Sequence, residues 1–177
     1  MRGDIAVAAL LLCLPGAALA QQKPQTEPKV VCTALAPPPP ELKGWASPTP
    51  LPAARRAAEL TQAALVPGKA ITAQFHPVAD VEYRVPPEKA DGPAVFGGLY
   101  ALKIDRAGTY RVASSAAPWM DVFVGKTPVT STAHGHGPDC TGVGKEVDFP
   151  LQPGDYLLQF SESLTPAAEI MVARLGR

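Results

Sequence analysis

Short runs in which apolar and polar residues alternate occupy most of the chain from Lys69 to its end. They are rich in β-branched and aromatic residues and are separated by Gly, Pro and Asp, a pattern typical of strands joined by turns. Eight strands are predicted, at residues 70–76, 95–104, 109–115, 119–124, 128–133, 145–149, 155–160 and 169–175. Because no helical pattern separates them, the fold class predicted is an all-β, antiparallel β-sandwich with a jelly-roll or Greek-key-like strand order.

The chain before these strands has two other patterns. Residues 53–65 place their apolar side chains loosely on one helical face, and Pro67 and Gly68 follow, so one short helix is expected there. Residues 21–52 are rich in proline and lack apolar periodicity, which predicts an extended, polyproline-like arm. The sandwich domain, with its short helix, is therefore expected to span residues 53–177.

The first twenty residues have the pattern of a secretory leader. An early arginine precedes an apolar run from Ile5 to Leu14, and small residues stand at Ala18 and Ala20. The run is shorter than the roughly 18 apolar residues that a membrane span needs, and Pro15 and Gly16 end it. A signal peptide at residues 1–20 is predicted, with export to the periplasm or the extracellular space and no membrane anchor in the mature chain.

Charge excludes one class of partner. The 177 residues carry 16 basic and 16 acidic side chains, and loss of the leader keeps them balanced. Because no polybasic run occurs, the sequence gives no sign of binding nucleic acid or an anionic membrane surface. A small molecule, a glycan or a protein of the cell envelope is the expected partner.

Two cysteines remain after the leader, Cys32 and Cys140. In an oxidising compartment a lone pair of cysteines is more often bridged than free, so a Cys32–Cys140 disulfide is predicted. The bridge would tie the proline-rich arm to the sandwich, and Trp45 offers a large apolar side chain to bury beside it.

Two similar segments, 104–112 and 151–159, each carry a tyrosine two residues after a glycine. In Greek-key sandwiches a tyrosine after such a turn bonds its hydroxyl to nearby backbone while its ring packs inside, an arrangement called a tyrosine corner. Tyr110 and Tyr156 are therefore expected to be structural.

The stretch TSTAHGHGPDCTG at residues 130–142 suggests three different roles. His134 and His136 would share one face of a strand, a spacing that suits a metal ion, and His76 could be a third ligand. With carboxylate from Asp80, Asp121 or Asp139, an Fe, Cu or Zn site is chemically available. The alternatives are a solvated glycine-rich loop or a loop held by the Cys140 bridge.

Catalytic motifs are sparse: the chain has no G-x-S-x-G, H-E-x-x-H or phosphate-loop pattern. Trp119 and Asp121 could form an aromatic and carboxylate platform for a sugar, although a tryptophan at such a position is more often part of a core. Catalytic residues cannot be assigned.

Several segments resemble small exported bacterial proteins that carry the label homogentisate 1,2-dioxygenase. The resemblance covers residues 44–175 and rests on GWASPTPL, LVPGKAITAQFHP, FGGLYAL, AGTYRV, WMDVFV, TSTAHGHGPDC and VDFPLQPGDYLLQFS. The label implies non-haem iron held by two histidines and a glutamate in a cupin fold, and the separated His-and-Glu pattern of a cupin does not occur here. The turns also resemble those of the pre-peptidase C-terminal type of β-sandwich.

Three functions follow as hypotheses. The first is an exported, non-catalytic β-sandwich that binds a small ligand, glycan, metal ion or partner protein. The second is a metal-dependent oxygenase that uses His134 and His136, with His76 as the candidate third ligand. The third is a structural accessory domain of the cell envelope, which the proline-rich arm spaces from another component.

Overall fold

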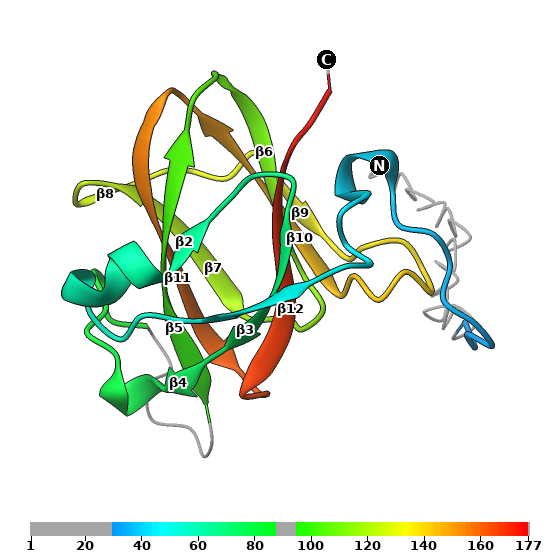
Figure 1. Cartoon of the computed structure of the whole chain (residues 1–177), viewed down its shortest axis with the longest axis horizontal. Helices are drawn as coiled ribbons and strands as arrows, with labels where there is room; N and C mark the ends of the chain where they lie inside the picture. Colours follow the sequence, from blue (N-terminus) through cyan, green and yellow to red (C-terminus); the bar gives the residue numbers. More distant parts are fainter. Residues whose placement is uncertain (1–29, 88–94, 177) are drawn as a thin grey trace, which may run out of the picture. The chain divides into compact units, whose positions relative to one another are not determined.

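Two six-stranded β-sheets form the sandwich in the computed structural model, which describes residues 30–87 and 95–176 (Figure 1). The predicted leader lies outside the described residues. The strands of sheet A, in spatial order, are β1 (Thr49–Pro52), β3 (Ala70–Gln74), β12 (Ala167–Arg174), β6 (Gly108–Ser114), β10 (Lys145–Leu151) and β9 (Ala133–Gly135). The strands of sheet B, in spatial order, are β2 (Ala64–Leu65), β5 (Phe96–Ile104), β11 (Gly154–Ser163), β7 (Trp119–Val124) and β8 (Thr127–Pro128). The sixth strand, β4 (His76–Pro77), also pairs with β5.

The predicted all-β sandwich is confirmed. Every pairing is antiparallel except β1 with β3 and β2 with β5, which are parallel. Six of the eight predicted runs overlap one strand each, and residues 70–76 cover β3 of sheet A and His76, the first residue of β4 in sheet B. The eighth, residues 128–133, is wrong as a single strand, because β8 ends at Pro128 in sheet B and β9 begins at Ala133 in sheet A. The residues between them cross from one sheet to the other.

Helical structure is limited to three short 3-10 turns in the described residues: η1 (Pro40–Leu42), η2 (Ala57–Gln62) and η3 (Val78–Asp80). The predicted helix at residues 53–65 is reduced to η2, because the ends of that run pair with strands instead. Ala53 donates its N–H to Gln74, and Ala54 pairs with Leu99. No helix in the described ranges is long and apolar enough to cross a membrane.

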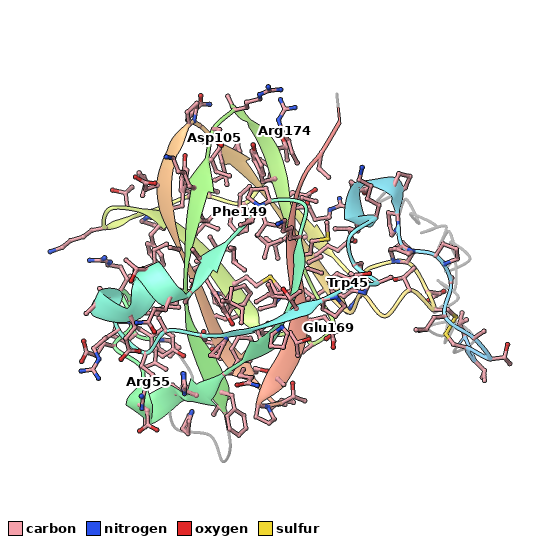
Figure 2. The ribbon with its side chains drawn as sticks, in the orientation of Figure 1. Trp45, Arg55, Asp105, Phe149, Glu169 and Arg174 are labelled. Atoms are coloured by element: carbon pink, nitrogen blue, oxygen red, sulfur yellow. A yellow bond between two sulfur atoms is a disulfide. The ribbon has the colours of Figure 1, made fainter. Side chains whose placement is uncertain are left out.

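The core lies between the sheets and is aromatic at its centre. Phe160 of β11 is fully buried, and its ring lies 5.8 Å from those of Phe75 and Tyr100. Tyr100 keeps its hydroxyl satisfied by donating to the carbonyl of Leu51 (2.9 Å), as a buried polar group requires. Phe149 also lies inside the sandwich (Figure 2).

Both predicted tyrosine corners have the expected hydrogen bond. Tyr110 donates its hydroxyl to the carbonyl of Arg106 (2.8 Å), and Tyr156 donates to the carbonyl of Gln152 (2.9 Å). Each bond spans four residues and closes the turn before a long strand, β6 or β11.

Residues 32–48, predicted as part of an extended arm, cover the outer face of sheet A. Leu42 and Trp45 are buried there in a second apolar cluster that also contains Ala70, Ala113, Val143, Met171 and Ala173. Figure 2 shows Trp45 outside the sandwich core and beside sheet A. We call residues 32–48 the covering segment; β1, which follows it, is a strand of sheet A.

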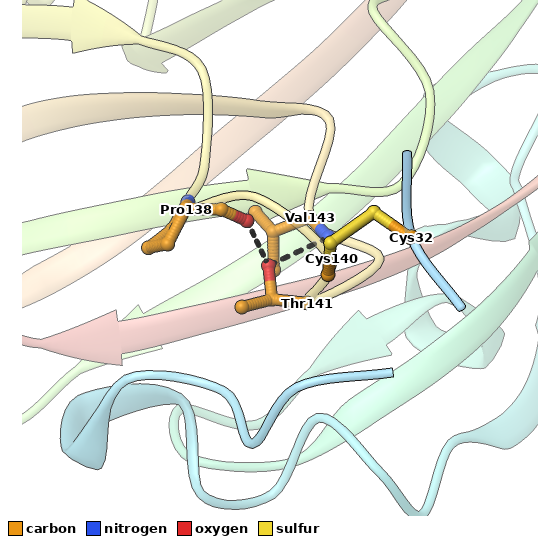
Figure 3. The surroundings of a disulfide bond; sticks show 5 residues. All are labelled: Cys32, Pro138, Cys140, Thr141 and Val143. Carbon is orange, nitrogen blue, oxygen red and sulfur yellow. Dashed lines mark hydrogen bonds between the residues drawn. A yellow bond between two sulfur atoms is a disulfide. The ribbon is translucent and has the colours of Figure 1, made fainter. Parts of the chain in front are cut away.

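The Cys32–Cys140 disulfide predicted from the sequence is confirmed (Figure 3). The N–H of Ala36 also donates to the carbonyl of Cys140 (2.7 Å), so the covering segment and the loop after β9 are held at two points. Thr141 stabilises this loop, because its hydroxyl donates to Pro138 (2.7 Å) and accepts the N–H of Val143 (3.2 Å).

Candidate functional site

The three histidines singled out in the sequence are not brought together. His134 lies in β9 of sheet A, whereas His76 lies in β4 of sheet B. His76 donates Nε2–H to the carbonyl of Ala53 (2.9 Å), and His136 donates Nδ1–H to the carbonyl of Gly144 (3.0 Å). Across residues 30–87 and 95–176, no group of three His, Cys, Asp or Glu is placed to hold a metal ion. Cys140 is bridged and therefore offers no thiolate.

Trp119, expected to favour the core, is instead exposed. It is the first residue of β7, and 56% of its surface remains accessible to solvent. Its indole Nε1–H donates to Oδ1 of Asp121 (3.2 Å), two residues along the same strand and therefore on the same face of sheet B. The predicted pairing of Trp119 with Asp121 is thus a direct contact at the surface.

Lys145 holds the same indole from the other sheet. Its Nζ lies 5.4 Å from the centroid of the Trp119 ring, within the range of a cation–π contact. The ammonium also donates to the carbonyl of Pro118 (2.7 Å). Because Lys145 begins β10 of sheet A, this contact joins the two sheets at the edge where Trp119 lies.

Partial burial changes the titration of both charged groups. It raises the pKa of Asp121, against the effect of the Trp119 hydrogen bond. Burial likewise lowers the pKa of Lys145, while the carboxylates of Glu162 and Asp121 oppose that change. Each group is thus desolvated and partly balanced by its neighbours, as is common where polar side chains are positioned for binding.

Glu162 reaches this group from an irregularity in β11. Phe160 pairs with Gly98 and Ser163 with Phe96, so Ser161 and Glu162 stand opposite Gly97 alone. This is a β-bulge, and Glu162 has a φ of 56°, an uncommon value for a residue other than glycine. Bulges redirect a side chain out of the regular alternation, and here the carboxylate is close enough to act on the pKa of Asp121 and Lys145.

A cavity of about 120 Å³ opens beside Trp119. We call it the Trp119 cleft. It lies where β7 of sheet B meets β9 and β10 of sheet A, below the segment that crosses between the sheets. Its lining consists of Trp119, Met120, Ser131, His134, Lys145 and Val147.

The sequence pointed to half of this site. It singled out Trp119, Asp121 and His134, and the cleft brings Trp119 and His134 together. It missed Lys145, which reads only as the first residue of a strand, and Glu162, whose position depends on a bulge that leaves no local signal. The polar groups converge on one exposed aromatic ring, an arrangement suited to hold a ligand that has both an apolar face and hydroxyl groups.

No protein-family model matches the chain, and no curated protein is detectably similar to it.

Proposed function

We propose that this protein is an exported, non-catalytic β-sandwich that binds a glycan or similar polyhydroxylated molecule at the Trp119 cleft. The observation that carries the proposal is an indole that is 56% exposed and yet held at two points, by Asp121 through its Nε1–H and by Lys145 over its ring.

A ring fixed in this way suits binding for an energetic reason. Ordering a mobile side chain on binding costs about 0.5 to 1.5 kcal/mol, and an indole already held by neighbours avoids most of that cost. Its exposed surface can pack against the C–H face of a sugar. Asp121 can accept hydrogen bonds from the hydroxyl groups of the same ligand, and Lys145 can donate to them.

Export is supported by two features of the chain. Residues 1–20 have the composition of a secretory leader, and the Cys32–Cys140 bridge is of the kind that persists in oxidising compartments. Both are consistent with a ligand found in the cell envelope or outside the cell.

Calorimetric titration with soluble cello-, xylo- and chito-oligosaccharides and with peptidoglycan disaccharides tests the proposal. We expect the wild-type protein to bind at least one of them, and Trp119→Ala to weaken that binding at least about tenfold, since a central aromatic contact is typically worth about 2 kcal/mol or more. Trp119→Phe should keep part of the affinity. The matched control is Val124→Ala, which removes a similarly exposed apolar side chain (50%) from the same strand.

Two results would contradict the proposal. One is the absence of binding to every member of the panel, which would favour a structural accessory role. The other is equal affinity of the wild-type and Trp119→Ala proteins, which would place any sugar site elsewhere on the surface.

A further inference from the structure

A second and larger cavity, about 610 Å³ in volume, lies against the outer face of sheet B. We call it the η2 cavity, because η2 forms one wall; η2 is the turquoise helical turn at the left of Figure 1. Its lining is Ala57, Leu60, Glu82, Tyr83, Arg84, Leu99, Lys126 and Leu157, none of which lines the Trp119 cleft. The volume falls within the usual range for small-molecule sites.

The floor of the η2 cavity is apolar. Leu99 of β5 stands opposite Gln159 of β11, and Leu157 lies two residues before Gln159, so both leucines are on one face of the sheet. Leu60 of η2 packs against the same apolar cluster from above. Burial raises the pKa of Tyr83, whose hydroxyl donates to the carbonyl of Phe160 (3.1 Å), so this wall stays neutral.

Two cations stand on the rim. Arg84 follows Tyr83, and Lys126 occupies the tight turn after β7, where Gly125 has a φ of 59°. Within the described ranges, neither Arg84 nor Lys126 has a carboxylate within ion-pairing distance. Both side chains are exposed and available to a ligand.

A buried amide fixes the backbone beside Arg84. Gln159 is 1% exposed; its Oε1 accepts the N–H of Arg84 (3.0 Å), and its Nε2–H donates to the carbonyl of Val85 (2.7 Å). A buried side-chain amide with backbone partners at both ends resists displacement, because leaving either atom unpaired is costly. Gln159 thereby holds the segment that carries Arg84 against sheet B.

Glu82 is the one acidic residue in the lining of the η2 cavity. Glu82 also lines a neighbouring cavity with Arg55, Arg56 and Asp80, and its N–H donates to the carbonyl of Arg55 (2.7 Å). Its charge also acts on Arg56, which lies outside the lining of the η2 cavity. Arg84 and Lys126 leave the rim with a positive balance over an apolar floor.

We propose that the η2 cavity binds a small amphipathic anion, a carboxylate attached to an aliphatic chain or aromatic ring. The carboxylate contacts Arg84 and Lys126, and the apolar body lies over Leu60, Leu99 and Leu157. Arginine suits this role because its guanidinium can donate two parallel hydrogen bonds to one carboxylate. This site is independent of the proposed glycan site.

The test compares decanoate below its micellar concentration with decanol and decylammonium, by calorimetry on the full exported chain. We expect decanoate to bind most tightly, and more weakly as salt rises. Arg84→Gln and Lys126→Gln should each weaken it by about fivefold and the double variant by about twentyfold, the size of one exposed ion pair for each residue. Lys103→Gln, which removes an exposed charge from β5 outside the lining, and Trp119→Ala should leave decanoate binding unchanged.

Several outcomes would overturn this proposal. Decanol binding as tightly as decanoate would show that the cations play no part. Unchanged affinity in the Arg84→Gln, Lys126→Gln double variant, or no binding of decanoate at all, would reject the site. Sedimentation with anionic lipid vesicles that depends on the same two residues would assign them to a membrane surface instead.

Discussion

The two tryptophans lie on opposite sheets and have opposite surroundings. Trp45 is 7% exposed and packs with Leu42 and Met171 on the outer face of sheet A, whereas Trp119 is 56% exposed at the edge of sheet B. The contacts around Trp45 are apolar, and those that hold Trp119 are a hydrogen bond and a cation–π contact. What differs is that Trp45 belongs to the covering segment, which packs it against sheet A, whereas no segment within residues 30–87 and 95–176 buries Trp119.

The charged residues near the two tryptophans also differ in their contacts. Under the covering segment, Arg111 donates to both oxygens of Asp148 (2.8 and 3.0 Å) and also contacts Glu146 (2.9 Å) and Glu41 of η1 (3.2 Å). Around Trp119, Asp121 and Lys145 both contact the indole rather than each other. We infer that the covered region serves stability and the open one serves binding.

Truncating each tryptophan should separate the two regions most clearly. Trp45→Ala removes a large buried side chain and should lower the free energy of unfolding by about 3 to 5 kcal/mol. Trp119→Ala should change it by less than about 0.5 kcal/mol, since most of its ring is already in water. Urea unfolding of both variants measures this; equal losses would mean that Trp119 is a structural residue too.

Removing the bridge should loosen only the covered region. Cys140→Ser should lower stability by about 2 to 5 kcal/mol and lower the Tm accordingly. Cys32→Ser and the double variant should match it, because the two cysteines act through one bond. Glycan affinity at the Trp119 cleft should survive in all three. A loss of that affinity would show that the covering segment supports the cleft as well.

The stability of the protein should depend on pH through Glu146, one of the acidic residues around Arg111 on sheet A. Burial raises the pKa of Glu146, against the attraction of Arg111. A carboxyl with a higher pKa in the folded chain stabilises it below the unfolded pKa, about 4.3, and loses that contribution as pH rises through the folded value. Glu146→Gln should therefore become progressively more stable relative to wild type from pH 4 to pH 7.

Asp148→Asn is the matched control for that experiment. It breaks the two-point contact with Arg111 and should destabilise the protein at neutral pH. If the stability difference between Glu146→Gln and wild type did not vary with pH, the carboxyl of Glu146 would titrate alike in the folded and unfolded chains.

The smallest effect is expected at the histidines. His134→Ala with His136→Ala should shift stability by no more than about 0.5 kcal/mol, with or without EDTA, because both side chains are exposed. A bound metal would stabilise the folded state by mass action. EDTA and the double variant lowering the Tm by similar, non-additive amounts would therefore establish a metal site and overturn this expectation.

The sequence predicted the long strands because packing of one face against the core imposes alternation, as in residues 145–149 of β10, where Val147 and Phe149 belong to the core. It could not predict β1, β2 or the break between β3 and β4, because β1, β2 and β4 have four residues or fewer and owe their conformation to β3 and β5. The exposure of Trp119 could not be predicted from the sequence either. It depends on which distant segment covers which face, and only the cysteine pair signalled that the covering segment goes to sheet A.

The border strands of the two sheets affect whether copies of the protein can aggregate by pairing their strands. Proline has no N–H to offer a neighbouring strand, and it occurs in β1 (Pro50, Pro52), β4 (Pro77) and β8 (Pro128). Each of these is a border of its sheet. Two other border strands have no proline: β9 of sheet A, with three residues, and β2 of sheet B, with two. In a crowded solution, strand-to-strand aggregation is thus hindered at β1, β4 and β8, and it would begin at β9 or β2.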